Sequence, residues 1–186
     1  MRNRFAALVL VSLCLGWVSI VKANGQASDT MTENGVDLLP VFAQDSTAWH
    51  VEVAFYVAVP KTASVLSKLE QIADRLSRFL FQYTGIGVIR IDTLDGRAIA
   101  HISLACDSMG RPWAGKYFEG SSRGHTTMLT LWKSFVQDDY HGEWIDGVKF
   151  YLGEMPVTDT WDHVHLAGVL YRSGSAPPGY RDPFSE

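Results

Sequence analysis

The sequence predicts an α+β fold, in which a mostly antiparallel sheet packs against one long amphipathic helix within a single domain. Three observations predict this fold: a strictly alternating apolar segment, an amphipathic segment that follows it, and a hairpin signal after that. The predicted order is strand, helix, strand and strand, with further strands toward the C-terminus, which is typical of α+β domains. With 186 residues, 47% of them hydrophobic, the chain can bury a core of its own.

The first predicted strand is the segment WHVEVAFYVAVP, which ends at Pro60. Every second residue in it is apolar, so one face of the strand is predicted to be buried. The predicted buried face consists of Trp49, Val51, Val53, Phe55, Val57 and Val59.

A long helix is predicted over residues 63–83, with Thr62 as its N-cap and Gly85 near its C-terminal end. Apolar residues recur in it at helical spacing, and the opposite face is polar and mixed in charge, which is typical of a helix packed on a sheet. The apolar stripe consists of Val65, Leu66, Leu69, Ile72, Leu76, Phe79, Leu80 and Tyr83.

The rest of the chain is predicted to add strands. Asp95-Gly96 separates the apolar runs IGVIRID and RAIAHISLA, and this dipeptide is typical of a tight hairpin turn. Residues 107–125 are Gly-rich and aromatic, and they are predicted to form a long loop. The segments TTMLTLW, VKFYL and HVHLAGVLY are predicted to be three further strands.

The N-terminus has the features of a secretory signal peptide, predicted over residues 1–23. Arg2 and Arg4 give a basic start, residues 5–20 form an uncharged apolar run, and small residues precede a cleavage site after Ala23. This run is shorter than the roughly 20 residues that a membrane-spanning helix needs, so no span is expected after cleavage. A polar leader over 24–46, the α+β domain over 47–172 and a flexible tail over 173–186 are predicted to follow.

Charge and cysteine content narrow the function classes. Without the three basic residues of the predicted signal peptide, 13 basic residues face 20 acidic ones, with no basic cluster, which argues against nucleic-acid binding. Cys106 is the one cysteine after the predicted cleavage site, so no internal disulfide is expected. We expect the protein to be secreted or periplasmic.

The segment WDHVHLAGVLYR suggests a metal site. Alternate residues of a strand share a face, so His163 and His165 would point the same way and could bind one Zn²⁺. The alternative interpretation is that the neighbouring apolar residues face the core and the two histidines form a partly solvated patch. A zinc site also needs a third ligand, for which the candidates are His125, His101, His141, Asp162 and Glu154.

Two short windows of the chain carry a family resemblance. GSSRGH, which ends at His125, and the later WDHVH resemble the zinc-binding motifs of the LAS-type peptidoglycan peptidases, the D-Ala-D-Ala carboxypeptidase and endopeptidase group. The resemblance implies that His125 is the first zinc ligand and His165 the last, with His163 or a nearby acid assisting. Trp132 stands where the family has an aspartate, and the glycine and alanine of the motif are missing.

Gly120-Ser121-Ser122-Arg123-Gly124 matches the Gly-x-Ser-x-Gly pattern of a nucleophile elbow. That chemistry requires a strand before the serine and a helix after it. Because a loop is predicted before this motif and a strand after it, a Gly/Ser loop is the preferred interpretation.

The leading functional hypothesis is a non-catalytic domain that binds a protein or a cell-envelope component, since no catalytic motif is intact. Aromatic side chains in residues 107–125 and 140–161 are predicted to form the contact surface, because such residues suit sugar or protein binding. These contact residues are Trp113, Tyr117, Trp144 and Trp161. The second hypothesis is a zinc-dependent hydrolase acting on peptidoglycan or peptides, with zinc bound by His125, His163 and His165, and Glu154 or Asp162 as general base.

Overall fold

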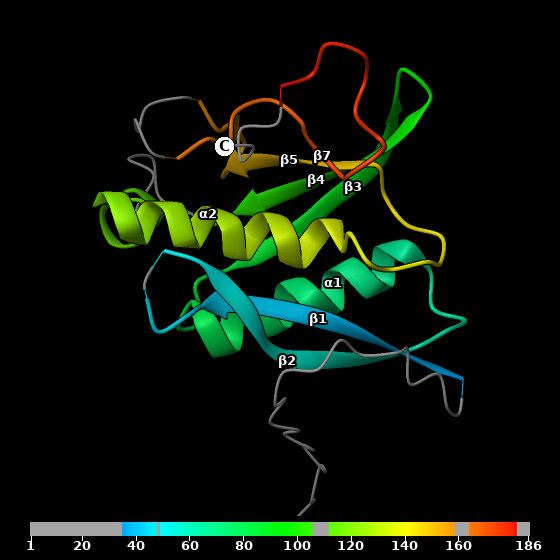
Figure 1. Ribbon diagram of the computed structural model, residues 1–186, viewed down its shortest axis with the longest axis horizontal. Coiled ribbons are helices and arrows are strands. Elements are labelled where there is room, and N and C mark those ends of the chain that lie inside the picture. The colour runs from blue at the N-terminus through cyan, green and yellow to red at the C-terminus, as the bar shows by residue number, and fades with distance from the viewer. Residues whose placement is uncertain (1–34, 48, 106–111, 159–163, 182–186) are drawn as a thin grey trace, which may run out of the picture.

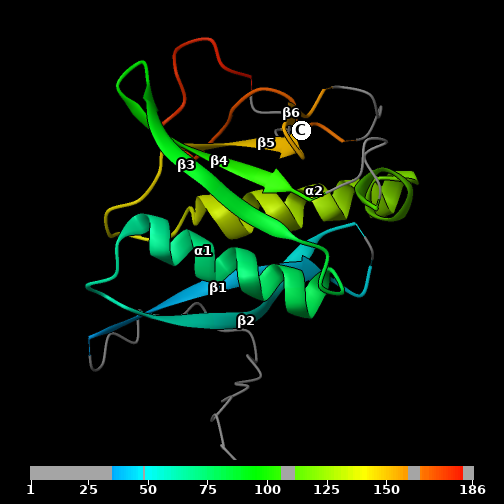
Figure 2. The same cartoon turned by 180° about the vertical axis from the view of Figure 1, so that it is seen from behind.

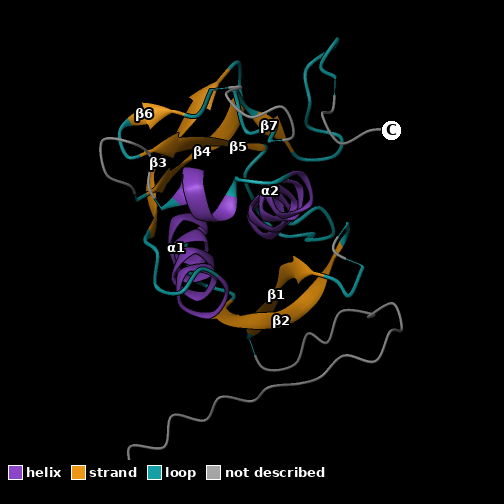
Figure 3. Ribbon diagram, turned by 90° about the vertical axis from the view of Figure 1, so that its left-hand side faces the viewer, coloured by secondary structure: helices purple, strands orange, loops and turns teal. Residues whose placement is uncertain are grey.

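The computed structural model describes residues 35–47, 49–105, 112–158 and 164–181. They form three layers (Figure 1 and Figure 3): a two-stranded hairpin, two helices side by side, and a larger sheet. The predicted α+β fold with mostly antiparallel strands is confirmed. The prediction of one principal helix is wrong, because the middle layer contains two.

The hairpin layer consists of β1 (Val36–Gln44) and β2 (Val51–Pro60), which pair antiparallel. β2 is the strand predicted from the alternating pattern. Val57 and Val59 are buried, while Ala58 between them is exposed, so the alternation does mark the face that packs on the helices.

β1 lies within the segment predicted as a polar leader over residues 24–46, so part of that segment forms a strand of the fold. Leu39 and Val41 of β1 are fully buried beneath the helices. Leu38 is exposed and Pro40 is half-buried, so one face of this strand meets the core.

The larger sheet has the strand order β3-β4-β5-β6, and a short strand β7 also pairs with β5. All pairs are antiparallel except β4 and β5, which are parallel. The strands are β3 (Ile86–Leu94), β4 (Arg97–Leu104), β5 (Gly147–Leu152), β6 (Met155–Pro156) and β7 (Leu170–Tyr171).

The turn between β3 and β4 is the predicted tight hairpin turn. Asp95 and Gly96 have φ angles of 51° and 77°. Positive φ at both central residues defines a type I′ turn, whose twist matches that of the flanking strands. The tight turn predicted at Asp95-Gly96 is therefore confirmed.

The predicted long helix is present, with different ends. α1 (Val65–Arg75) continues into a π-helical turn, η1 (Leu76–Leu80). The N-cap is Ser64 rather than Thr62, and its hydroxyl accepts a hydrogen bond from the backbone N–H of Ser67 at 3.2 Å. Seen from behind, α1 lies between the hairpin and β3 (Figure 2), and Leu69, Ile72 and Leu76 of the predicted apolar stripe are buried. Leu66, Phe79 and Tyr83, which were also predicted to belong to the stripe, are exposed.

The second helix, α2 (Ser121–Val136), replaces the predicted strand TTMLTLW and the end of the predicted loop. Residues 126–132 are all buried, because α2 lies between β1 of the hairpin and β5 of the larger sheet (Figure 1). Over residues 126–132 the helix therefore has no exposed face, and this part of its sequence shows no helical period. α2 also supplies the crossover that two parallel strands require.

The C-terminal part differs from its predicted form. The strand predicted over HVHLAGVLY is reduced to β7, and residues 164–169 form no strand. Part of the predicted flexible tail contacts the domain: Arg97 Nε donates to the Ser175 carbonyl at 2.6 Å, and the Tyr180 ring packs edge-on against Tyr171. The flexible tail over 173–186 stays a prediction, with Ser175 and Tyr180 in contact with the domain.

A buried polar cluster, the Lys68 cluster, ties the layers together. Lys68 Nζ donates to Asp37 Oδ2 and to Tyr140 Oη, both at 2.8 Å, and Tyr140 Oη donates to the same Asp37 oxygen at 2.6 Å. Asp37 belongs to β1, Lys68 to α1, and Tyr140 to the segment after α2. The cluster therefore joins the hairpin to α1 and to the segment after α2.

The pKa values in the Lys68 cluster follow from burial and hydrogen bonding. Burial acts to raise the pKa of Asp37, but the hydrogen bonds from Lys68 and Tyr140 outweigh it and leave the pKa below its ordinary value. Burial likewise acts to lower the pKa of Lys68, and its bonds to Asp37 and Tyr140 reverse this and raise it. Both groups are thus held in their charged forms.

The predicted signal peptide over residues 1–23 and Cys106 lie outside the described residues. Within the described part, no helix combines the length and the apolar character of a membrane span. Export therefore stays a prediction from the sequence.

Candidate functional site

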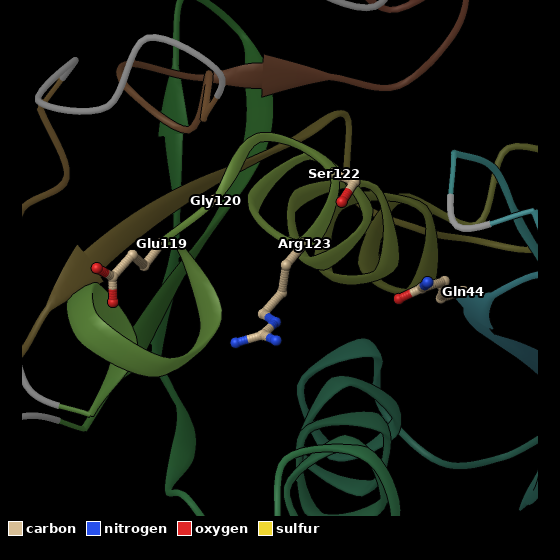
Figure 4. Close-up of a pocket in the computed structure, with 5 residues that line it drawn as sticks. All are labelled: Gln44, Glu119, Gly120, Ser122 and Arg123. Carbon is tan, nitrogen blue, oxygen red and sulfur yellow. The ribbon is translucent and has the colours of Figure 1, made fainter.

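A polar hollow opens at the end of the molecule where α2 begins. It has a volume of about 370 Å³ and is lined by Gln44, Glu119, Gly120, Ser122 and Arg123. Figure 4 shows the Arg123 side chain projecting from the first turn of α2, with Glu119 on one side and Gln44 on the other. β1 and the start of α2 thus build the hollow together.

Local backbone structure positions these side chains. A π-helical turn, η2 (Trp113–Tyr117), precedes α2, and Gly120 joins them with a φ angle of 84°, which favours glycine. Arg123 Nη1 donates to the Lys116 carbonyl at 3.4 Å. Thr126 Oγ1 lies 3.4 Å from Gln44 Oε1 and connects the end of β1 to α2.

The hollow offers both donors and acceptors. Its lining includes one carboxylate, one guanidinium, one carboxamide and one hydroxyl. Because the charge of Glu119 offsets that of Arg123, the hollow does not favour a small anion over a neutral molecule. The arrangement suits a neutral ligand with several hydroxyl groups, which can donate and accept hydrogen bonds at the same time.

Three exposed aromatic side chains lie at the same end of the molecule, and we call them the aromatic rim. Trp49, Phe79 and Tyr83 are 55%, 56% and 79% exposed. Trp49 lies in the β1–β2 turn, Phe79 in η1, and Tyr83 just beyond it; Figure 1 shows these segments beside the start of α2. Lys116, which precedes the hollow, donates to the side chain of Gln82 next to Tyr83.

The aromatic residues predicted as ligand contacts do not belong to this surface. Trp113, Tyr117 and Trp144 are buried, and Trp161 lies outside the described residues. The rings of Trp113 and Tyr117 pack around Phe81, with centroids 4.9 and 5.1 Å away. The three buried side chains stabilise the core, so they do not form the predicted contact surface.

The structure describes only some of the predicted zinc ligands. His125 is half-buried on α2, and His165 is exposed. The backbone N–H of His165 donates to Met128 Sδ at 3.0 Å, and Met128 lies one turn after His125, so these two segments are neighbours. His163 and Asp162 lie outside the described residues, and Glu154 is exposed between β5 and β6.

Within the described residues, no three His, Cys, Asp or Glu side chains gather as a metal site would require. His101, one candidate for the third ligand, is instead hydrogen-bonded to Asp92 and Tyr151. Because His163 lies outside that part of the chain, the zinc site stays a prediction.

The Gly-x-Ser-x-Gly motif forms the start of α2. Ser122 is followed by a helix, contrary to the predicted strand, but η2 precedes it where a nucleophile elbow has a strand. The motif therefore contributes Ser122 and Arg123 to the hollow, without the strand–turn–helix geometry of a hydrolase elbow.

Comparison with known proteins gives no family for this chain. No family model matches it, and no curated protein or solved structure matches it either. The geometry of the hollow and the aromatic rim is therefore the basis on which a function is proposed.

Proposed function

We propose that the protein is an exported domain that binds a glycan of the cell envelope through the polar hollow and the aromatic rim. The observation that carries the proposal is that the segments bearing three exposed aromatic side chains lie at the same end of the molecule as the polar hollow. Clusters of exposed apolar side chains are uncommon on the surface of a folded protein. Such clusters often mark binding sites.

Sugars match both parts of this surface. The apolar faces of a sugar ring pack against aromatic side chains, and its hydroxyl groups hydrogen-bond to carboxylate, guanidinium and amide groups. The hollow supplies those polar groups in Glu119, Arg123 and Gln44. The aromatic rim supplies the flat apolar surface.

The test uses purified protein and two probes: insoluble peptidoglycan in a sedimentation assay, and a soluble N-acetylglucosamine oligomer in calorimetric titration. We expect Trp49→Ala and Arg123→Ala each to weaken binding at least about tenfold, which is usual for a central aromatic or arginine contact. The matched controls are Leu94→Ala, an exposed apolar residue at the β3–β4 turn, and Arg181→Ala in the C-terminal segment. Both controls should leave binding unchanged.

Two outcomes contradict the proposal. The first is the absence of binding to either probe by folded wild-type protein. The second is binding that all four variants retain, which would place the glycan elsewhere. Binding of an envelope protein that Trp49→Ala abolishes, with no glycan binding, would instead assign the same surface to a protein ligand.

The second candidate function is the zinc-dependent hydrolase, and one observation favours it. The hydrogen bond from the His165 backbone to Met128 brings His165 to the helix that carries His125. Both would act as neutral imidazole ligands of zinc. Elemental analysis of the wild type and of a His125→Ala/His165→Ala variant tests it: one bound zinc lost in the variant supports the hydrolase, and no zinc in either removes it.

A further inference from the structure

A carboxylate, an imidazole and a phenol are hydrogen-bonded in series on the larger sheet. His101 Nε2 lies 2.9 Å from Asp92 Oδ1, and His101 Nδ1 lies 2.7 Å from Tyr151 Oη. The three residues come from the adjacent strands β3, β4 and β5. Ala100 and Ile102, on either side of His101, belong to the core, so the series lies on the opposite face, away from the helices.

The direction of each hydrogen bond follows from the charge of Asp92. Hydrogen bonds from Arg90 and His101 lower the pKa of Asp92, so its carboxylate is ionised at neutral pH. An ionised carboxylate only accepts hydrogen bonds, so His101 Nε2 carries a proton. In the neutral imidazole, Nδ1 is then the acceptor, and the phenol of Tyr151 donates to it.

One cation lies beside the phenol, and a second lies beside the carboxylate. Lys149 Nζ is 5.8 Å from the centre of the Tyr151 ring, and Arg90 pairs directly opposite His101 in the β3–β4 register. Arg90 Nε also donates to Asp92 Oδ2 at 2.9 Å. The positive charge of Lys149 beside Tyr151 favours a reactant that carries negative charge.

We propose that Tyr151 is a nucleophile that takes up the acyl group of a negatively charged acyl donor, with His101 as its general base and Asp92 as the residue that positions His101. The arrangement is that of a hydroxyl, a base and an orienting carboxylate, the usual components of nucleophilic catalysis. This site is distinct from the hollow and does not depend on glycan binding.

The chemical step balances within the proposed participants. Tyr151 Oη attacks the carbonyl carbon and forms a new C–O bond, while the bond from that carbon to the leaving group breaks. The phenol proton passes to His101 Nδ1 and then to the leaving group. The imidazolium that forms in between is stabilised by the Asp92 carboxylate.

The test uses mono(4-nitrophenyl) glutarate, an anionic activated ester, with 4-nitrophenyl acetate as its uncharged counterpart. Acylated tyrosines are located and timed by mass spectrometry, and Tyr83 serves as the internal reference because it is 79% exposed. We expect Tyr151 to be acylated at least about tenfold faster than Tyr83, as general-base assistance predicts. The anionic ester should show the larger difference.

Matched variants separate the series from general surface reactivity. Asp92→Asn and His101→Gln should remove the advantage of Tyr151. Asp74→Asn, which alters an aspartate of similar exposure that also pairs with an arginine, and His141→Gln should preserve it. His101 is buried, so circular dichroism is needed to show that His101→Gln is folded. Asp92 is half-exposed, so Asp92→Asn tests the series without changing a buried side chain.

Two results would overturn the proposal. One is acylation of Tyr151 no faster than that of Tyr83 in the wild type. The other is an unchanged rate at Tyr151 in folded Asp92→Asn, which would show that the series does not activate the phenol.

Discussion

Replacing Lys68 with methionine should destabilise the protein by about 3–5 kcal/mol, the range found when one partner of a buried ion pair is removed. Methionine keeps most of the length and the apolar stem of lysine, so the loss reports on the charge and its hydrogen bonds. The side chains of Lys68 and Asp37 are only 6% and 12% exposed. Lys68→Met would therefore leave the Asp37 carboxylate largely out of water, with Tyr140 as its remaining side-chain donor.

The size of the effect is large in relation to total stability. A domain of this length is usually stable by about 5–15 kcal/mol, so Lys68→Met would remove a substantial part. Since about 1 kcal/mol corresponds to about 2–4 °C for a chain of 150–250 residues, the melting temperature should fall by roughly 6–20 °C.

The assay is urea unfolding followed by far-UV circular dichroism, with two comparison variants. Arg78→Met removes the same charge from an exposed pair with Asp74, and it should cost less than about 1 kcal/mol. Lys68→Met/Asp37→Leu removes both charges of the buried pair and should lie within about 1–2 kcal/mol of the wild type, because well-packed apolar residues can replace a buried pair. If Lys68→Met costs no more than Arg78→Met, the cluster does not hold the hairpin in place.

Two further predictions concern pH and the hairpin turn. Because the pKa of Asp37 is lowered in the folded state, its contribution is present above the ordinary value of 3.8 and is lost as pH falls through the folded pKa. Because the pKa of Lys68 is raised in the folded state, its contribution to stability is present below pH 10.5 and is lost as pH rises through the folded pKa. Urea unfolding at a series of pH values should therefore show that the wild type loses stability relative to Lys68→Met/Asp37→Leu at both low and high pH. Gly96→Ala should destabilise the protein by about 1–2 kcal/mol, because Gly96 has a positive φ. Gly87→Ala, at a strand position with open space for a Cβ, should be neutral or slightly stabilising. Equal melting temperatures for the two variants would contradict the assignment of the turn.

The elements with one buried face could be predicted from the sequence, and those without one could not. β2, α1 and the β3–β4 hairpin each show a period or a turn signal, because one face meets the core and the other meets water. α2 shows no period, since it is enclosed by the hairpin and the larger sheet. Its threonines also suggest a strand, yet Thr126 donates to the Ser122 carbonyl at 3.0 Å and so is accommodated within a helix.

The candidate site was less predictable because it depends on tertiary arrangement. Aromatic content suggested a binding surface, but nothing in the sequence distinguishes the buried Trp113 from the exposed Trp49. Ser122 and Arg123 belong to a sequence motif, whereas Gln44 reaches the hollow from a strand far away in sequence. The one local signal for the hollow is Gly120, whose positive φ ends one helical turn and starts the next helix.

β1 and β2 are synthesised before the other described elements, so the hairpin emerges before the residues that it packs against. Phe42 donates its backbone N–H to Ser134 Oγ, and Asp37 is bonded to Tyr140, so partners lie 92 and 103 residues apart. Contacts of such separation form late, and apolar surface that lacks its partner invites association with other chains. Until about residue 140 has left the ribosome, the inner face of β1 and β2 has no complete cover, so the nascent chain should bind a general chaperone most strongly during that interval.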